Sequence, residues 1–371
     1  MTSVETIQTK ITQEPNEENW LELGVAYEAE GRHQEAAQAY SQVLTINPEN
    51  AEAHFRIGTL LFLNEHLDEA YPFLHEAVQK APDNGIYWNN IGLLLYTQGE
   101  LHKALAAFEA AYEVAPELKE VLIYIGKIRF ELKNPDGALE ACDEIISLEP
   151  EYPDILLTKS NALVALLKIE DAWSAIFKAV NYFPDNAGIL SVAGNLSIIR
   201  KKPKLAQSYF NKALSIDEKH YESLLGQGTL ATQRTDYKLA QQWYQKALQV
   251  DDSRVDAYHG MVMIAFGKDD PEGLEIWVER GIEKDPFHAD LRYYRGLYLL
   301  RKDNIDDAKT SYLDALAANP FHYQSHFELA NIYHINLNDD RNALGHLKKV
   351  IEVAPDSSTA KVAQQMIQKL Q

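Results

Sequence analysis

Three histidines near the end of the chain have a spacing that could hold a metal ion. His322 and His326 are four residues apart, so on a helix they would share one face, and His334 follows two turns later. Two imidazoles at this spacing can form half of a zinc site, which then needs further Cys, His, Asp or Glu ligands. No acidic residue or cysteine completes the set, and His322 precedes the expected helix start. We therefore predict no metal site.

Two further features resemble reactive chemistry. Residues 226–231, Gly-Gln-Gly-Thr-Leu-Ala, look like a truncated dinucleotide fingerprint, but such a fingerprint follows a β-strand and here it lies inside a helical pattern. Cys142 is the only cysteine, which excludes an intramolecular disulfide and any CxxC site, and we interpret it as a small core residue. No cluster of Ser, His and Asp suggests a catalytic triad. The sequence predicts neither enzyme activity nor a cofactor.

The charge of the chain restricts its partners. Its 371 residues include 35 Lys and Arg against 55 Asp and Glu, a formal net charge of −20. Such a surface repels nucleic acid and anionic membranes and favours a neutral or basic protein partner. Residues 1–16 lack the apolar run of a secretory signal, and no stretch approaches the ~18 apolar residues of a membrane helix. We expect a cytoplasmic protein that does not insert into membranes.

The chain is built from a sequence repeat with a period of 34 residues, and this repeat sets the positions of all the residues named above. Repeats that start at residues 17, 51, 85, 119, 153, 187, 221, 255, 289 and 323 align without a gap until the last. Position eight is Gly, Ser or Ala in nine of ten repeats, and position twenty is almost always Ala, whereas position twenty-four is usually large. Because two helices approach closely only at small side chains, these positions predict where the helices of each hairpin meet.

Proline marks the ends of these helices. Position thirty-two holds Pro48, Pro82, Pro116, Pro150, Pro184, Pro286 and Pro320, and position seventeen holds Pro135, Pro203 and Pro271. Proline stops a helix when it falls inside one and is accepted in a first turn. No segment alternates with the period of two that a strand shows. The sequence predicts an all-α chain of ten hairpins.

The repeat resembles the tetratricopeptide pattern. The first repeat carries its residues at Trp20, Leu23, Gly24, Tyr27, Ala36, Tyr40 and Pro48. The resemblance covers residues 17–355 and implies a right-handed α-solenoid. Residues 356–371 are predicted to form a capping helix that covers the last repeat through Val362, Met366 and Leu370, and residues 1–16 a shorter leader or partial cap through Ile7 and Ile11.

Two repeats depart from the pattern. Repeat eight has Val262 in place of Gly, Leu274 in place of Ala, and Gly281 at position twenty-seven, which predicts either a hinge or a compensated repacking of the core. Repeat ten has one extra residue, which the alignment places in residues 337–342.

The resemblance also implies a binding surface. In this family, positions two, five, nine and twelve of the first helices line a concave groove. Some members clamp acidic tails with a set of Lys, Asn and Arg residues at these positions of adjacent repeats. That clamp is absent from the first three repeats, whose positions five and nine hold Leu21, Val25, Phe55, Thr59, Asn89 and Leu93. The candidate partner-binding residues are mostly apolar: Phe55, Phe62, Asn89, Tyr96, Ile123, Lys127, Phe130, Leu157, Asn161, Asn195, Ile198, Met263, Phe266, Tyr293 and Phe327. An apolar strip of this extent indicates a protein contact, although packing between repeats must bury part of it.

Two details refine the expected partner. Position two is acidic in seven repeats, which stabilises helix N-termini and would also favour basic residues beside the apolar anchors of a client. Asn161 and Asn195 share position nine in successive repeats, where two amides could hold a client backbone. The predicted function is a scaffold or adaptor that binds an extended segment or amphipathic helix of a client; the alternative is a structural protein that assembles with copies of itself.

Overall fold

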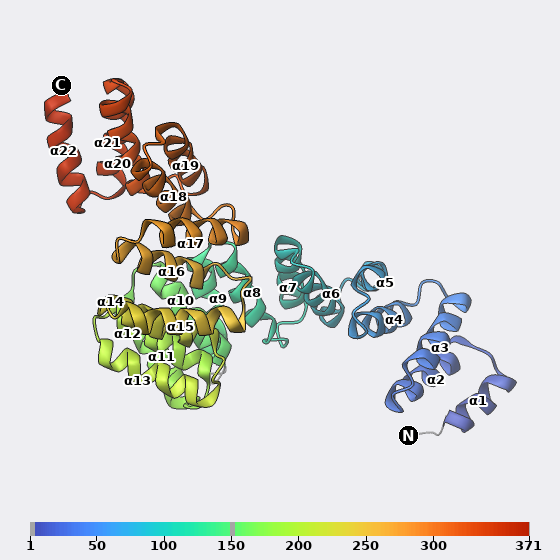
Figure 1. The fold of residues 1–371 in the computed structure, drawn as a ribbon. Coiled ribbons are helices and arrows are strands. Elements are labelled where there is room, and N and C mark those ends of the chain that lie inside the picture. Colours follow the sequence, from blue (N-terminus) through green and yellow to red (C-terminus); the bar gives the residue numbers. More distant parts are fainter. Residues whose placement is uncertain (1–3, 149–152, 371) are drawn as a thin grey trace. The chain divides into compact units, whose positions relative to one another are not determined.

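A computed structural model describes residues 4–148 and 153–370 (Figure 1). Within these ranges the chain forms helices and turns with no β-strand, which confirms the prediction of an all-α solenoid. The helices fall into two compact units, residues 1–183 and residues 184–371. Pro150 and the outermost residues of the two terminal segments, 1–3 and 371, lie outside the described ranges.

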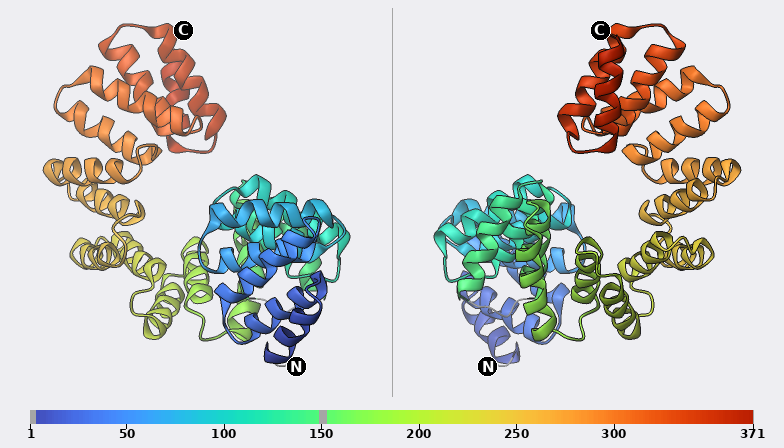
Figure 2. Two further views of the ribbon diagram at one scale, coloured as in Figure 1. Left: turned by 90° about the vertical axis from the view of Figure 1, so that its right-hand side faces the viewer. Right: turned by 90° about the vertical axis from the view of Figure 1, so that its left-hand side faces the viewer.

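Each unit is a row of helical hairpins, and in Figure 2 the helices of each unit follow one another in chain order. The first unit contains α1 (Val4–Gln13), α2 (Glu17–Ala29), α3 (His33–Ile46), α4 (Ala51–Leu63), α5 (Leu67–Lys80), α6 (Gly85–Thr97), α7 (Leu101–Val114), α8 (Val121–Glu131), α9 (Pro135–Leu148), α10 (Pro153–Ala165) and α11 (Ile169–Tyr182). The second contains α12 (Ala187–Ile199), α13 (Pro203–Ile216), α14 (Tyr221–Gln233), α15 (Tyr237–Val250), α16 (Asp256–Gly267), α17 (Pro271–Lys284), α18 (Ala289–Arg301), α19 (Ile305–Ala318), α20 (Tyr323–Asn331), the π-helical turn η1 (Ile332–Asn336), α21 (Asp340–Val353) and α22 (Ser358–Leu370). None of the described helices is long and apolar enough to cross a bilayer.

Capping side chains set the start of most first helices. The residue before the helix accepts a hydrogen bond from a backbone N–H of the first turn, which would otherwise lack a partner. The capping residues are Asn16, Asn50, Asn84, Asn186, His220, His288 and His322. Leu118 and Arg254 stand at the same position but do not cap. The helices that follow them, α8 and α16, start late, at Val121 and Asp256, without a side-chain cap.

Glycine at position eight makes room for the large residue at position twenty-four. A Cβ atom on Gly92 would lie 3.0 Å from the ring of Phe108, and one on Gly228 would lie 2.5 Å from the ring of Tyr244. Both distances are too short for an unstrained contact. The ring therefore lies between the two helices of the hairpin only because position eight has no side chain.

Repeat eight fills the same space with residues of different size. Val262 replaces the glycine, Val278 replaces the ring, and both are fully buried, as is Leu274. Gly281 leaves room for Leu291, whose Cδ1 atom would lie 2.6 Å from a Cβ atom at that position. The structure thus shows a compensated repacking, in which a smaller residue stands opposite each larger one.

Every hairpin turns through one residue with a left-handed backbone, two residues before its second helix. The φ angle there lies between 50° and 77°. Glycine occupies the position only as Gly31 and Gly99; the other residues are Glu65, Lys133, Leu167, Lys201, Thr235, Asp269, Asp303 and Asn338. A non-glycine residue in this conformation costs roughly 1–2 kcal/mol.

The extra residue of repeat ten lies inside the helix rather than in the turn. The left-handed residue Asn338 stands two residues before α21, as in the other hairpins, so the turn has its usual length. The additional residue is taken up by η1, which continues α20. The placement in residues 337–342 was therefore wrong.

Helices cover both ends of the array. Ile7 and Ile11 of α1 are buried against the first hairpin together with Val4. At the other end, Ala360 and Ala363 of α22 are buried and Met366 and Leu370 pack beside them. Val362 is 44% exposed, so its predicted role in covering the last repeat is wrong. The buried face of α22 begins at Ala360.

Candidate partner-binding surface

The three histidines do not converge on one point. His322 accepts the capping hydrogen bond from Ser325 N at Nδ1, so its Nε2 carries the proton and can donate. The partners are Asp290 for His322 (3.0 Å), His346 for His326 (2.8 Å) and Asp340 for His334 (2.6 Å). Burial lowers the pKa of His346 to about 4. Each histidine has a structural contact of its own.

The other reactive features are also explained by packing. Cys142 is fully buried, and desolvation raises the pKa of its thiol to about 12, so it stays protonated and unreactive near neutral pH. Gly226 lies inside α14 and faces the ring of Phe210, in the preceding hairpin, while Gly228 faces Tyr244. Both glycines of the apparent dinucleotide motif thus make room for aromatic rings.

Nine of the predicted partner-binding residues lie in the first unit, and none is fully buried. They are Phe55 and Phe62 on α4, Asn89 and Tyr96 on α6, Ile123, Lys127 and Phe130 on α8, and Leu157 and Asn161 on α10. Several contact neighbours within the chain. Phe55 stacks on Tyr87 with ring centroids 4.6 Å apart, and Lys127 pairs with Asp154 at 2.7 Å. The lone base expected in the groove is therefore neutralised.

The remaining six lie in the second unit: Asn195 and Ile198 on α12, Met263 and Phe266 on α16, Tyr293 on α18 and Phe327 on α20. Asn195 is exposed, and Phe266 is 39% exposed. Asn161 and Asn195 belong to different units, and their pairing stays a prediction.

Aromatic rings in the second unit touch one another across successive hairpins. We call Phe266, Tyr294, Tyr293 and Tyr312 the aromatic run. Their consecutive ring centroids are 5.3, 5.3 and 5.9 Å apart. The Tyr294 hydroxyl lies 2.9 Å from the sulfur of Met263. The sequence pattern did not single out Tyr294 because position six was not counted among the groove positions.

The acidic residues at position two are mostly paired within the chain. Their partners are Arg56 for Glu52 (2.7 Å), Lys127 for Asp154 (2.7 Å), Arg254 for Glu222 (2.7 Å) and for Asp256 (3.3 Å), and His322 for Asp290 (3.0 Å). The hydrogen bond from His322 holds the pKa of Asp290 below its usual value. This row offers a basic client less free charge than the sequence suggests.

Within the described ranges, one carboxylate that the sequence pattern did not single out lacks the ion pair that most acidic residues at position two have. Glu328, at position six on α20, is half-buried, and it accepts a hydrogen bond from Asn331 Nδ2 at 3.4 Å. It makes no ion pair with any residue in the described ranges. Burial raises its pKa above the usual value. The sequence could not single out Glu328 by its charge, because position six is also charged at Glu22 and Arg56.

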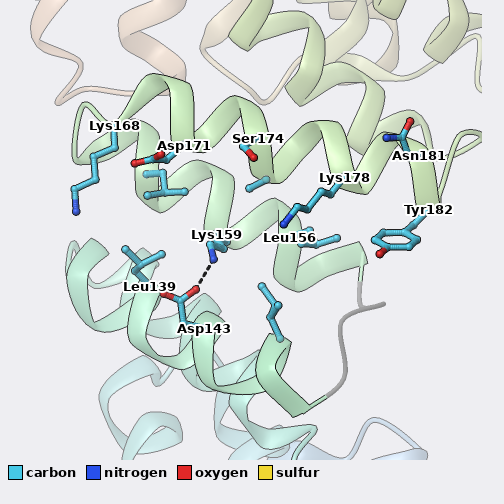
Figure 3. Close-up of a pocket in the computed structure, with 13 residues that line it drawn as sticks. Leu139, Asp143, Leu156, Lys159, Lys168, Asp171, Ser174, Lys178, Asn181 and Tyr182 are labelled. Carbon is cyan, nitrogen blue, oxygen red and sulfur yellow. Dashed lines mark hydrogen bonds and ion pairs between the residues drawn. The ribbon is translucent and has the colours of Figure 1, made fainter.

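A pocket of about 650 Å³ opens between α9, α10 and α11 (Figure 3). Lys159 stands on its floor at position seven, where the four preceding repeats hold Leu or Ile, and pairs with Asp143 across the pocket. Lys168, Asp171 and Lys178 line the α11 wall. The pocket mixes both signs of charge, so the apolar surface of the second unit is the better candidate for a protein contact.

Comparisons with known proteins agree with this architecture. Two family models, both described as tetratricopeptide repeat, match residues 27–91 and residues 89–154 and 295–358, together just over half of the chain. A search of curated proteins found no sequence relative.

Solved structures share the fold at low identity. A human IFIT1 dimer with m7Gppp-AAAA has a TM-score of 0.62 at 17% identity, covering 86% of this chain and 81% of that chain. The Cut9–Hcn1 hetero-tetramer of the APC/C gives 0.58 at 12% identity, with 99% and 92% covered. Yeast Tom70 gives 0.56 at 14%, with 99% and 91% covered. With these matches, the hairpin array and the motif of its first repeat, the chain belongs to the tetratricopeptide-repeat family.

Proposed function

We propose that this protein is a scaffold or adaptor that binds a segment of a client protein on the first-helix surface of its second unit. The observation that carries the proposal is the aromatic run. It links α16, α18 and α19, and Phe266 at its end is 39% exposed. Tyr312 is buried, whereas Phe266, Tyr293 and Tyr294 are partly exposed and supply apolar area for an extended segment or a helix.

The similar structures favour a protein client without naming one. Cut9–Hcn1 is an assembly of proteins, a hetero-tetramer. The IFIT1 structure instead contains a capped RNA oligonucleotide. A formal charge of −20 opposes RNA binding by this chain, because affinity for nucleic acid depends on neutralising its phosphates. We therefore expect no RNA-dependent shift in a filter-binding or mobility assay.

The test compares two variants that each remove exposed apolar area. In one, Met263→Ser and Phe266→Ser interrupt the surface at α16. In the other, Phe287→Ser removes a side chain that is 80% exposed in the turn before α18. We expect a client identified by affinity capture with the parent chain to be lost with the first variant and retained with the second. A client retained by the first variant, or lost equally from both, would contradict the proposal.

Self-assembly is the competing function for the same apolar surface. Light scattering over a range of concentrations separates the two. A mass that stays at one chain favours a separate client, whereas a rising mass that the Met263→Ser, Phe266→Ser variant abolishes identifies a second copy as the partner.

A further inference from the structure

Glu328 lies beside the aromatic run without a positive charge to balance it. Position six of a first helix packs against position twenty-four of the preceding hairpin: Gly226 and Gly260 face the rings of Phe210 and Tyr244 in this way, and Glu328 holds the same position relative to Tyr312. In agreement, the carboxylate of Glu328 contributes, after burial, to raising the pKa of both Tyr293 and Tyr312. A half-buried carboxylate without a cation is unfavourable, because it has lost hydration without gaining an ion pair. This places an unsatisfied negative charge at the edge of an aromatic surface.

The same position in repeat two shows what is missing. Arg56 stands at position six there, next to Tyr40, as Glu328 stands next to Tyr312. Arg56 is balanced by Glu28 at 2.8 Å and by Glu52 at 2.7 Å.

The counter-charges have no equivalent around Glu328. Glu28 occupies position twelve of the preceding repeat, and Glu52 occupies position two of the same repeat. The corresponding residues of repeats nine and ten are Leu300 and Gln324, which are both neutral. Neither of these two positions therefore supplies a cation that could pair with Glu328.

Two further features mark this point. The hydroxyl of Tyr312 is fully buried and makes no hydrogen bond in the structure, which is costly for a polar atom. Asn331, which donates to Glu328, stands at position nine, and η1 begins directly after it. π-Helical turns inside α-helices occur frequently at functional sites.

We propose that Glu328, with Tyr293 and Asn331, binds an arginine side chain of the client segment. A guanidinium presents a planar set of N–H donors to a carboxylate and can also stack on an aromatic face. A lysine ammonium is a point charge that is hydrated more strongly and lacks the planar match. The subsite rests on the proposed function, because the arginine belongs to the segment that the aromatic run holds.

The test uses the full chain and short fluorescent peptides with one central residue between leucines. The central residue is arginine, lysine or citrulline, which has nearly the shape of arginine but no charge. By fluorescence anisotropy we expect the arginine peptide to bind roughly tenfold more tightly than the citrulline peptide. The lysine peptide should fall between them.

Three variants locate the charge that is responsible. Glu328→Gln should abolish the preference for arginine, and Glu283→Gln, at an exposed site on α17, should keep it. Gln324→Arg leaves Glu328 in place but supplies an internal cation four residues away, as in the pair of Glu52 and Arg56, and should also abolish the preference. Circular dichroism checks that each variant is folded.

The outcomes separate this inference from the proposed function. Equal binding of the arginine and citrulline peptides, or of the arginine and lysine peptides, overturns the arginine site, as does a preference that survives Glu328→Gln. Absence of binding by all three peptides also overturns it. None of these results changes whether a client is lost with Met263→Ser and Phe266→Ser, which is decided separately.

Discussion

The residue at position six has opposite charge and opposite surroundings in repeats two and ten. In repeat two, Arg56 lies between two carboxylates, and the hydroxyl of Tyr87 donates to one of them, Glu52, at 2.7 Å. In repeat ten, Glu328 has one long hydrogen bond from Asn331 and no ion pair within the described ranges. Both residues stand at position six of a first helix, but repeat ten also continues into η1, so the two places differ in their side chains and in the helix that follows.

Arg56 is a structural charge that is already paired within the chain, whereas Glu328 is a charge that a partner could still pair with. The ion pairs around Arg56 are satisfied within the chain, and a partner would have to break them to use them. The carboxylate of Glu328 gains an ion pair only from outside. In a repeat protein, charge at equivalent positions must therefore be judged with its counter-ions and not from the repeat pattern alone.

The largest expected effect follows the removal of Arg56. Arg56→Gln leaves Glu28 and Glu52 without their shared cation, and we expect the first unit to lose about 1–3 kcal/mol of unfolding free energy. This loss of unfolding free energy is smaller than for a fully buried ion pair because the Arg56 side chain is partly solvated. Urea denaturation with hydrogen exchange in α2 to α5 measures it. Arg32→Gln is the control, because the side chains of Arg32 and of its partners are 42% exposed or more, and it should have a smaller effect. Equal losses would refute the comparison.

Removing two tyrosine hydroxyls should have opposite results. Tyr87→Phe deletes the donor to Glu52 and should cost ~0.5–1.5 kcal/mol. Tyr312→Phe deletes a buried hydroxyl that has no partner, and phenylalanine already occupies the same position as Phe108 and Phe210. It should be neutral or stabilising. Thermal unfolding of both variants decides the matter, and a clear loss with Tyr312→Phe would show that its hydroxyl is satisfied.

Neutralising Glu328 should stabilise the free protein. Its pKa is raised by burial, so the folded state favours the protonated form and loses stability as pH rises from the ordinary glutamate pKa through the raised one. Glu328→Gln should therefore gain ~0.5–1 kcal/mol above that window, since the group is still partly solvated, and little below it. Unfolding of parent and variant across this pH range measures the difference. A loss of stability at neutral pH would mean that the carboxylate has a cation already.

The architecture could be read from the sequence because packing repeats every 34 residues. Gly92 and Phe108 are sixteen residues apart in the chain, so their contact lies within a single hairpin and appears again in the next. The capping asparagines and the prolines act locally as well. The exchange of sizes between Val262 and Val278 was less visible, because it requires that the two positions be compared together.

Whether an individual charged side chain is paired or free could not be predicted from the sequence in the same way. The acidic residues at position two looked available, but Glu222 is paired with Arg254, which lies 32 residues later in the chain. The alignment placed the extra residue of repeat ten in residues 337–342, whereas η1 takes it up within the helix. Both outcomes depend on neighbours in three dimensions that a repeat alignment does not specify.

The smallest expected effect tests whether the stabilities of the two units respond equally to a change at the left-handed turn residue. The left-handed residue of the hairpin turn is glycine in the first unit at Gly31 and Gly99, but never glycine in the described turns of the second. Gly99→Ala should destabilise the first unit and Thr235→Gly should stabilise the second, each by ~0.5–1 kcal/mol. The size is the conformational strain of about 1–2 kcal/mol less the extra chain entropy of glycine. No atom lies near a Cβ at Gly99, so crowding cannot explain a loss. Denaturant unfolding followed by hydrogen exchange in each unit measures both changes. If the two changes are equal in size and opposite in sign, the two units respond alike to a backbone change, and unequal responses to Arg56→Gln and Glu328→Gln then report the charges. If Thr235→Gly instead destabilises the second unit, the two units cannot be compared in this way, and the side chain of Thr235 must contribute to the fold.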